Sequence, residues 1–130
     1  MSLDEALGIW AEAAQDLSSA GLARAAGTTY NCADLCNQVA EKALQAVYVL
    51  RHDARASYNH DLVALGELAQ APREVLDDLA ALSPYHPESF LKGRGMDEGD
   101  DEVSDETAAD LMERARRVLR WARQFVLAAG

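Results

Sequence analysis

The chain has 130 residues and a formal net charge of −10, with 49% hydrophobic and 26% charged residues. This length fits one unit with a real hydrophobic core, and we expect a single domain over residues 1–130. The composition, rich in Ala and Leu, is typical of a soluble helical protein, whereas the negative charge opposes diffuse binding to phosphate backbones. No apolar run approaches the roughly 20 residues of a membrane span. Acidic residues also interrupt the first 17 positions, so we predict a cytoplasmic protein that has no signal peptide and does not enter a membrane.

Two long helical patterns come first. From Leu3 onward, apolar residues recur three or four positions apart, at Leu7, Trp10, Ala14, Leu17 and Ala20. Gly27 ends this helix, and Thr28 or Thr29 can cap a second helix that runs from about Tyr30 to Arg51. Because the turn between them is short, the two helices are predicted to be antiparallel neighbours.

Two shorter helical patterns follow a polar connection over residues 52–61. The first has apolar residues at Leu62, Leu65 and Leu68. Pro72 then opens another helix at its first position, before Pro84 and Pro87 end it. The residues of that helix expected to face inward are Val75, Leu76, Leu79 and Leu82.

The last third of the chain contains an acidic segment and a final helix. Residues 88–103 combine several glycines with a dense acidic run, and we expect an acidic flexible loop there. Ser104 is the expected N-cap of the final helix, because two acidic residues occupy its first turn. Its apolar side comprises Leu111, Ala115, Val118, Leu119, Ala122 and Phe125. The whole pattern predicts an all-α fold, an up-and-down four-helix bundle with a subdivided third helix.

Arginines and cysteines offer two further candidate features. The final helix carries five arginines at positions 114, 116, 117, 120 and 123, which we interpret as a solvated face paired with nearby acids in preference to a phosphate-binding stripe. Cys32 and Cys36 lie one helical turn apart and would need two more ligands to hold zinc. We interpret them as small core residues, and we predict no metal site and no cofactor.

The middle of the second helix resembles the HEPN domain family. The relevant text is Gln38-Val39-Ala40-Glu41-Lys42-Ala43-Leu44-Gln45, followed by His60-Asp61-Leu62. An Asp-Leu step at Asp16-Leu17 and the closing run "ARRVLRWARQFV" fit the same family pattern, which fails mainly between Tyr85 and Glu102. The resemblance implies a homodimer that contacts nucleotide or RNA. It also implies a partner, a minimal nucleotidyltransferase, in a toxin-antitoxin-like pair.

In similar proteins the second and last helices face a groove at a dimer interface. The residues of this chain that would contact a nucleotide there are Asn37, Gln38, Glu41, Lys42, His60 and Asp61. Asn37 and Glu41 would form hydrogen bonds, and Lys42 would meet a phosphate. The alternative is plainer. Gln38, Glu41, Lys42 and Gln45 would form an exposed polar stripe, and His60-Asp61 would cap the helix that starts at Leu62.

Catalysis is the point at which the sequence departs from the family. HEPN ribonucleases carry an Arg followed roughly four to six residues later by His near the start of the last helix, whereas Arg94 has no such His after it. We therefore lean against an enzyme. Arg55 and His60, in "RASYNH", match the spacing but lie after the second helix. A metal-independent endoribonuclease using this pair is one alternative, and a plain helical scaffold without a ligand is another.

Apolar bulk near the two ends of the chain gives a separate reason to expect a homodimer. The residues concerned are Trp10, Trp121, Phe125 and Val126. They exceed what one small bundle needs to bury, and a helix face shared with a second copy would cover the excess.

Overall fold

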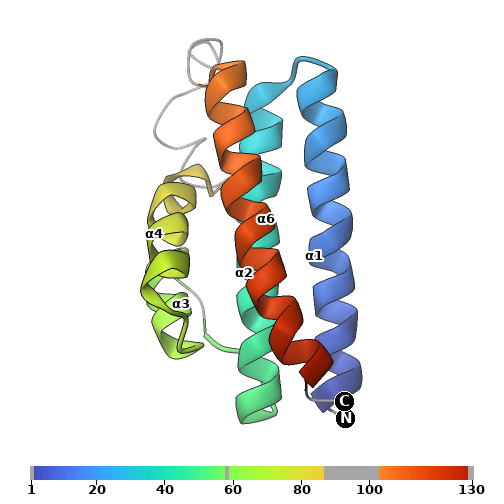
Figure 1. Cartoon of the computed structure of the whole chain (residues 1–130), viewed down its shortest axis with the longest axis vertical. Helices are drawn as coiled ribbons and strands as arrows, with labels where there is room; N and C mark the ends of the chain where they lie inside the picture. Colours follow the sequence, from blue (N-terminus) through green and yellow to red (C-terminus); the bar gives the residue numbers. More distant parts are fainter. Residues whose placement is uncertain (1, 58, 87–102, 129–130) are drawn as a thin grey trace.

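The chain is all-α over the residues that the computed structural model describes, which are 2–57, 59–86 and 103–128. Three long helices lie side by side: α1 (Ser2–Ala25), α2 (Thr29–His52) and α6 (Asp105–Ala128). The shorter α3 (Leu62–Leu68) and α4 (Arg73–Leu82) pack beside α2 and α6 (Figure 1), and a 3₁₀ turn, η1 (Ser83–Tyr85), follows α4. The predicted acidic loop lies outside the described residues except for its last residue, Val103.

Alanine lines much of the core between the three long helices. The fully buried alanines include Ala13 and Ala20 on α1, Ala40 and Ala43 on α2, and Ala115 on α6. Small side chains allow helix axes to approach closely, so this composition favours long, tightly packed helices over a core built on large aromatic residues.

The core face of α1 is rotated from the predicted one. Leu7, which the apolar periodicity included, is 41% exposed. Ala6, Ile9 and Ala13 are buried in its place. Periodicity weighs large apolar residues most heavily, whereas α1 turns its small residues toward α2 because they permit the closest approach.

The turn between α1 and α2 is close to the prediction. Gly27 adopts φ 86°, a conformation that glycine tolerates without a steric cost. Thr28 occupies the N-cap position of α2 but does not cap it with its side chain. Its Oγ1 instead donates to the carbonyl of Ala23 at 3.0 Å, which ties the turn to the end of α1.

The subdivided third element is a hairpin of two antiparallel helices. Asp61 caps α3 by accepting hydrogen bonds from the N–H groups of Val63 and Ala64, as the polar step before Leu62 predicted. The N–H of Leu62 donates to Ser83 Oγ at 3.2 Å, so the start of α3 lies beside the end of α4. Pro72 is the N-cap of α4, one position before the expected first helical residue.

The last helix follows its predicted pattern. Ser104 Oγ accepts a hydrogen bond from the N–H of Thr107 at 3.0 Å, which confirms the cap. Five of the six predicted apolar positions are buried, namely Leu111, Ala115, Val118, Leu119 and Ala122. The sixth, Phe125, is half-buried. No helix among the described residues combines the length and the apolar character that a membrane span requires.

Candidate functional site

Asn37 is a buried anchor in the middle of α2. Its side chain is fully buried, and Nδ2 donates to the carbonyl of Leu82 at 2.9 Å and to that of Ser83 at 3.4 Å. Leu82 ends α4 and Ser83 begins η1, so this amide holds the end of the α3–α4 hairpin against α2. Of the predicted groove residues, Asn37 therefore has the clearest structural task.

Gln45 holds the connection between α2 and α3. Its side chain is 4% exposed. Nε2 donates to the carbonyl of Ala56 at 3.0 Å, and Oε1 accepts from the N–H of the same residue at 2.8 Å. One amide thus satisfies both backbone groups of a loop residue, as a neighbouring strand would. This loop crosses over Gln45, which removes that residue from the exposed stripe that the sequence suggested.

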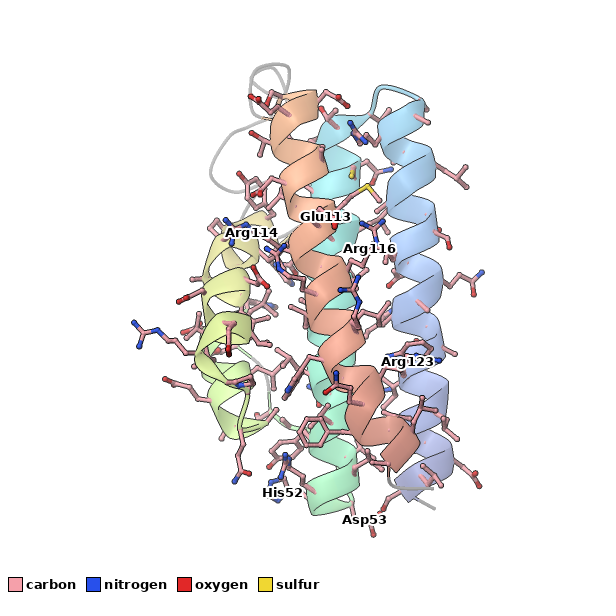
Figure 2. The ribbon with its side chains drawn as sticks, in the orientation of Figure 1. His52, Asp53, Glu113, Arg114, Arg116 and Arg123 are labelled. Atoms are coloured by element: carbon pink, nitrogen blue, oxygen red, sulfur yellow. The ribbon has the colours of Figure 1, made fainter. Side chains whose placement is uncertain are left out.

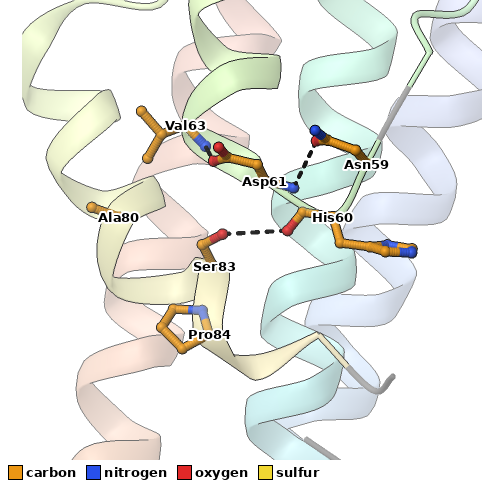
Figure 3. Close-up of a pocket in the computed structure, with 7 residues that line it drawn as sticks. All are labelled: Asn59, His60, Asp61, Val63, Ala80, Ser83 and Pro84. Carbon is orange, nitrogen blue, oxygen red and sulfur yellow. Dashed lines mark hydrogen bonds between the residues drawn. The ribbon is translucent and has the colours of Figure 1, made fainter. Parts of the chain in front are cut away.

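Two further hydrogen bonds hold the end of the same loop. Asn59 Oδ1 accepts from the N–H of Asp61 at 3.2 Å, and the carbonyl of His60 accepts from Ser83 Oγ at 3.4 Å (Figure 3). His60 adopts φ 74°, which is uncommon for a residue with a side chain and persists here because the residues on both sides are held. Specific hydrogen bonds therefore fix the backbone from Asn59 to Asp61.

His60 lies at the edge of a shallow, open pocket of about 490 Å³. The pocket is formed by the start of α3 and the end of α4, and its lining includes Asn59, Asp61, Ala80, Ser83 and Pro84. The imidazole points away from Ala80 and Pro84 in Figure 3. It stacks on the ring of His86, with 3.9 Å between the ring centroids. Two imidazoles from separate segments thus meet beside the pocket.

Glu41 connects this pocket edge to α2. Burial raises the pKa of its carboxyl, while the nearby charges of Lys42, Arg55 and His60 act in the lowering direction. Arg55 and His60 are therefore both close enough to act on one carboxylate. Arg55 is 55% exposed, and its ion pair among the described residues is a long one, 3.9 Å, with Glu5 of α1. We call Glu41, Arg55, His60 and His86 the loop cluster.

Lys42 does not join the loop cluster as an uncommitted charge. Its Nζ lies 2.8 Å from Asp16 and 3.7 Å from Glu12, both on α1, and the hydrogen bond to Asp16 raises the pKa of the lysine. Of the other predicted groove residues, Glu41 lies within electrostatic range of His60, and His60 and Asp61 line the same pocket. Gln38 is half-buried on α2. The structure assigns Asn37 and Lys42 to contacts within the bundle.

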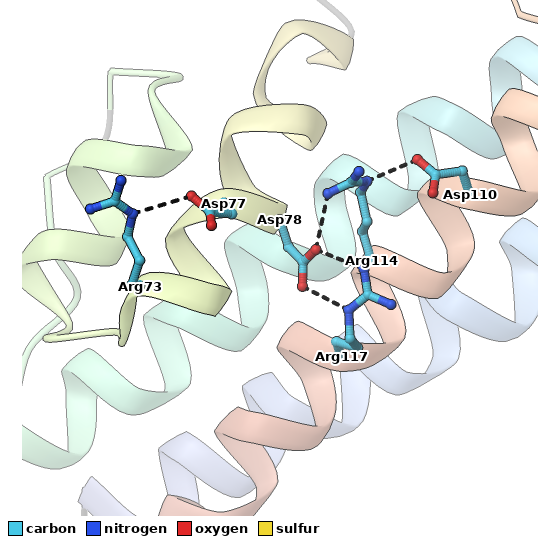
Figure 4. A network of polar contacts seen from close by, with 6 residues as sticks. All are labelled: Arg73, Asp77, Asp78, Asp110, Arg114 and Arg117. Carbon is cyan, nitrogen blue, oxygen red and sulfur yellow. Dashed lines mark hydrogen bonds and ion pairs between the residues drawn. The ribbon is translucent and has the colours of Figure 1, made fainter.

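The arginines of α6 include a network that the sequence did not reveal. Asp78 of α4 is only 4% exposed. Arg117 contacts it through Nε at 3.0 Å and Nη2 at 2.8 Å, and Arg114 adds a bond at 3.1 Å while also binding Asp110 (Figure 4). Asp78 lies between Val75 and Leu79 on the apolar face of α4. An acid in that position must be paired if it is buried, and this was the sequence feature from which the network could have been predicted.

The predicted pairing of the arginine face is confirmed for part of it. Arg116 pairs with Glu113 at 2.8 Å, in addition to the pairs of Arg114 and Arg117. Arg120 and Arg123 form no ion pair with any residue that the structure describes. Cys32 and Cys36 are buried free thiols, as interpreted from the sequence.

The apolar bulk that suggested a homodimer is largely accommodated within the chain. Trp10 Nε1 donates to the carbonyl of Leu119 at 3.1 Å, and Val126 is 2% exposed. Trp121 and Phe125 are half-buried and pack edge to face, with centroids 5.1 Å apart. Trp121 and Phe125 keep part of their surface exposed, so the homodimer stays a prediction.

Comparisons with known proteins identify a fold and a family. No curated protein matches the chain. Among solved structures, TT1696 from Thermus thermophilus superimposes with a TM-score of 0.79 at 16% identity, covering 92% of this chain and 97% of that one. ST0689, an archaeal HEPN homologue, gives a TM-score of 0.78 at 20% identity, covering 93% and 97%. These two likenesses show the fold. The model of the HEPN domain matches residues 8–125, nearly the whole chain, and the chain therefore belongs to the HEPN domain family.

Proposed function

We propose that this chain is a HEPN module that binds a nucleotide or RNA at the loop cluster. The observation that carries the proposal is the clamped loop after α2, which presents an exposed Arg55 and the His60–His86 pair beside the half-buried Glu41. In a chain with a net charge of −10, a phosphate can be held only where cations are gathered locally.

The chemistry of the loop cluster suits a phosphate with a sugar or base attached. A guanidinium donates two parallel hydrogen bonds to a phosphate, and imidazole rings donate hydrogen bonds and stack on bases. The pocket of about 490 Å³ beside His60 lies within the size range of small-molecule sites. Gln38 and Glu41 border this region as further hydrogen-bonding groups. Asn37 supports the pocket indirectly, because its hydrogen bond to the carbonyl of Leu82 fixes the end of α4.

A binding measurement tests the proposal. Fluorescence anisotropy of a labelled single-stranded oligouridine should give a saturable curve with the full chain. Arg55→Gln should weaken binding about ten-fold and reduce the slope of log K against log salt by about 0.7, the value for each phosphate that a protein neutralises on a single strand. Arg73→Gln is the matched control, because Arg73 is also exposed and, in the described part of the chain, forms an ion pair with Asp77 alone. Absent binding, or equal losses in both variants, would refute the proposal.

The wider role that we propose follows the family. The module would be cytoplasmic and homodimeric, and would form one half of a toxin-antitoxin-like pair with a minimal nucleotidyltransferase. It would have no ribonuclease activity, because the sequence lacks the Arg-to-His spacing at the start of the last helix. Co-purification with the product of a neighbouring nucleotidyltransferase gene tests the pair. Absence of a complex, with a monomeric mass by light scattering, would refute both the partner and the dimer.

A metal-independent endoribonuclease is the second candidate function. It is favoured by one observation, that the charges of Arg55 and His60 both lower the pKa of the Glu41 carboxyl, which places each of them within electrostatic range of that group. His60 would move the proton of the attacking 2′-hydroxyl, and Arg55 would stabilise charge on the phosphate. His60→Ala should then abolish cleavage of RNA without changing the helical circular dichroism. Cleavage that persists in this variant would exclude the enzyme. A scaffold without a ligand predicts no saturable thermal shift with any nucleotide.

A further inference from the structure

A second pocket lies on the surface between α4 and α6, and it shares no residue with the pocket beside His60. Its volume is about 340 Å³, near the lower end of the range for small-molecule sites. Its polar and aromatic lining combines an indole, two guanidinium groups, an amide and two carboxylates, which belong to Trp121, Arg117, Arg120, Gln124, Glu74 and Asp78.

Trp121, the aromatic wall of the pocket, is supported by packing on neighbouring side chains. Trp121 packs edge to face on Phe125, and the guanidinium of Arg51 lies 4.9 Å from the centre of the Phe125 ring. Arg51 is itself fixed by a hydrogen bond to Gln70 Oε1 at 3.0 Å. The indole therefore keeps its orientation in the absence of a ligand, which lowers the entropy cost of stacking a planar ring on it.

The arginine side of the pocket has positive charge available for an anion. Asp78 would repel an anion, but it is buried under the guanidinium groups of Arg114 and Arg117. Arg120 lines the same pocket and forms no ion pair with any residue in the described part of the chain. Glu74, the other acid of the lining, is exposed and accepts hydrogen bonds only, so the ligand must also carry hydroxyl or amino donors.

A ligand that satisfies all these groups has a planar ring, donor groups and an anionic end. We infer that the α4–α6 pocket is a separate site for a nucleoside monophosphate, with the base on Trp121, the sugar or base donors near Glu74 and Gln124, and the phosphate on Arg120. This inference does not rest on the loop cluster. It assigns a role to Arg120, whose guanidinium forms no ion pair within residues 2–57, 59–86 and 103–128.

Quenching of tryptophan fluorescence by AMP tests the site in the full chain. AMP should quench saturably, whereas adenosine and inorganic phosphate should each bind more weakly, because each meets only one wall of the pocket. Arg120→Gln should weaken AMP binding about ten-fold or more, the usual worth of a charge-assisted hydrogen bond. Arg123→Gln is the matched control. It makes the same charge change on the same helix, but Arg123 lies on the α1 side of α6 (Figure 2) and does not line the pocket.

Three results would overturn the inference. The first is the absence of saturable quenching by AMP at millimolar concentration, and the second is an equal loss of affinity in Arg120→Gln and Arg123→Gln. The third is a loss in Arg55→Gln with none in Arg120→Gln. That last result would move the nucleotide to the loop cluster, so the proposed function would stand while this site would fail. Conversely, binding of AMP that needs Arg120 while oligouridine fails to bind would support this site alone.

Discussion

Two glycines inside helices should respond in opposite directions to the same substitution. Gly8 of α1 and Gly66 of α3 both occupy interior helical positions. A Cβ added at Gly8 would meet nothing within 4 Å, whereas one added at Gly66 would overlap Cδ1 of Leu79 and come within 3.0 Å of Cδ2 of Leu76. Leu79 is fully buried, so its side chain can shift only against close-packed neighbours. Gly66 therefore permits the close approach of α3 to α4.

The magnitude follows from two terms. Replacing glycine with alanine inside a helix favours folding by about 1 kcal/mol, and this term applies to both sites. Overpacking a tight interface costs about 1–3 kcal/mol, and it applies only at Gly66. Gly8→Ala should thus raise the free energy of unfolding by about 1 kcal/mol. Gly66→Ala should lower it by about 1 kcal/mol, so the difference between the variants isolates the steric term.

Urea denaturation followed by circular dichroism measures this difference. With an m-value of about 2 kcal/mol per molar, the two midpoints should be separated by roughly 1 M. The hairpin of α3 and α4 also carries the start of the pocket beside His60, so Gly66→Ala should weaken binding of oligouridine while Gly8→Ala should not. A Gly66→Ala protein as stable as the Gly8→Ala protein would refute the packing argument.

Three other substitutions test the supports of the loop cluster. Asn37→Asp replaces a hydrogen-bond donor with a buried carboxylate that faces the carbonyl of Leu82. This variant should lower the free energy of unfolding by about 3 kcal/mol or more at pH 7 and by less near pH 4. Urea titrations at both pH values measure the difference. Gln45→Ala removes both bonds to Ala56 and should speed amide hydrogen exchange across the loop after α2, with a cost of about 1–3 kcal/mol. Because burial raises the pKa of Glu41, its ionised form opposes folding, so this penalty is absent below the unfolded pKa and grows as pH rises through the folded one. Glu41→Gln should therefore be more stable than the parent at pH 7 and equal to it at pH 4, and an advantage that is independent of pH would contradict the assignment.

Features that depend on neighbours in sequence were predictable. The helices follow from apolar residues spaced three and four apart, and the caps at Asp61 and Ser104 follow from short side chains placed where a helix starts. The order of the polar run in α2 and of His60-Asp61 indicated the HEPN family, which the match over residues 8–125 confirms. The spacing of Arg55 and His60 offered an alternative catalytic pair, and the role of that pair stays a prediction.

Features that depend on long-range packing were not predictable from spacing. Asn37, Gln45 and Lys42 lie along one polar run, yet the fold buries the first, covers the second with a loop and pairs the third with α1. The stacking of His86 on His60 required two segments to meet that are 26 positions apart in the sequence, and the pairing of Asp78 with Arg117 joined α4 to α6.

The sequence by itself determined that this protein is helical, where its helices begin and end, and which family it belongs to, because these properties arise from local periodicity, from caps and from the order of short motifs. Only the tertiary structure decided which polar residues hold the bundle together and which ones meet at its surface. The physical reason is that burial and pairing depend on what the rest of the chain brings to a side chain. Two glycines or two arginines in similar helical positions therefore acquire different roles once the helices pack.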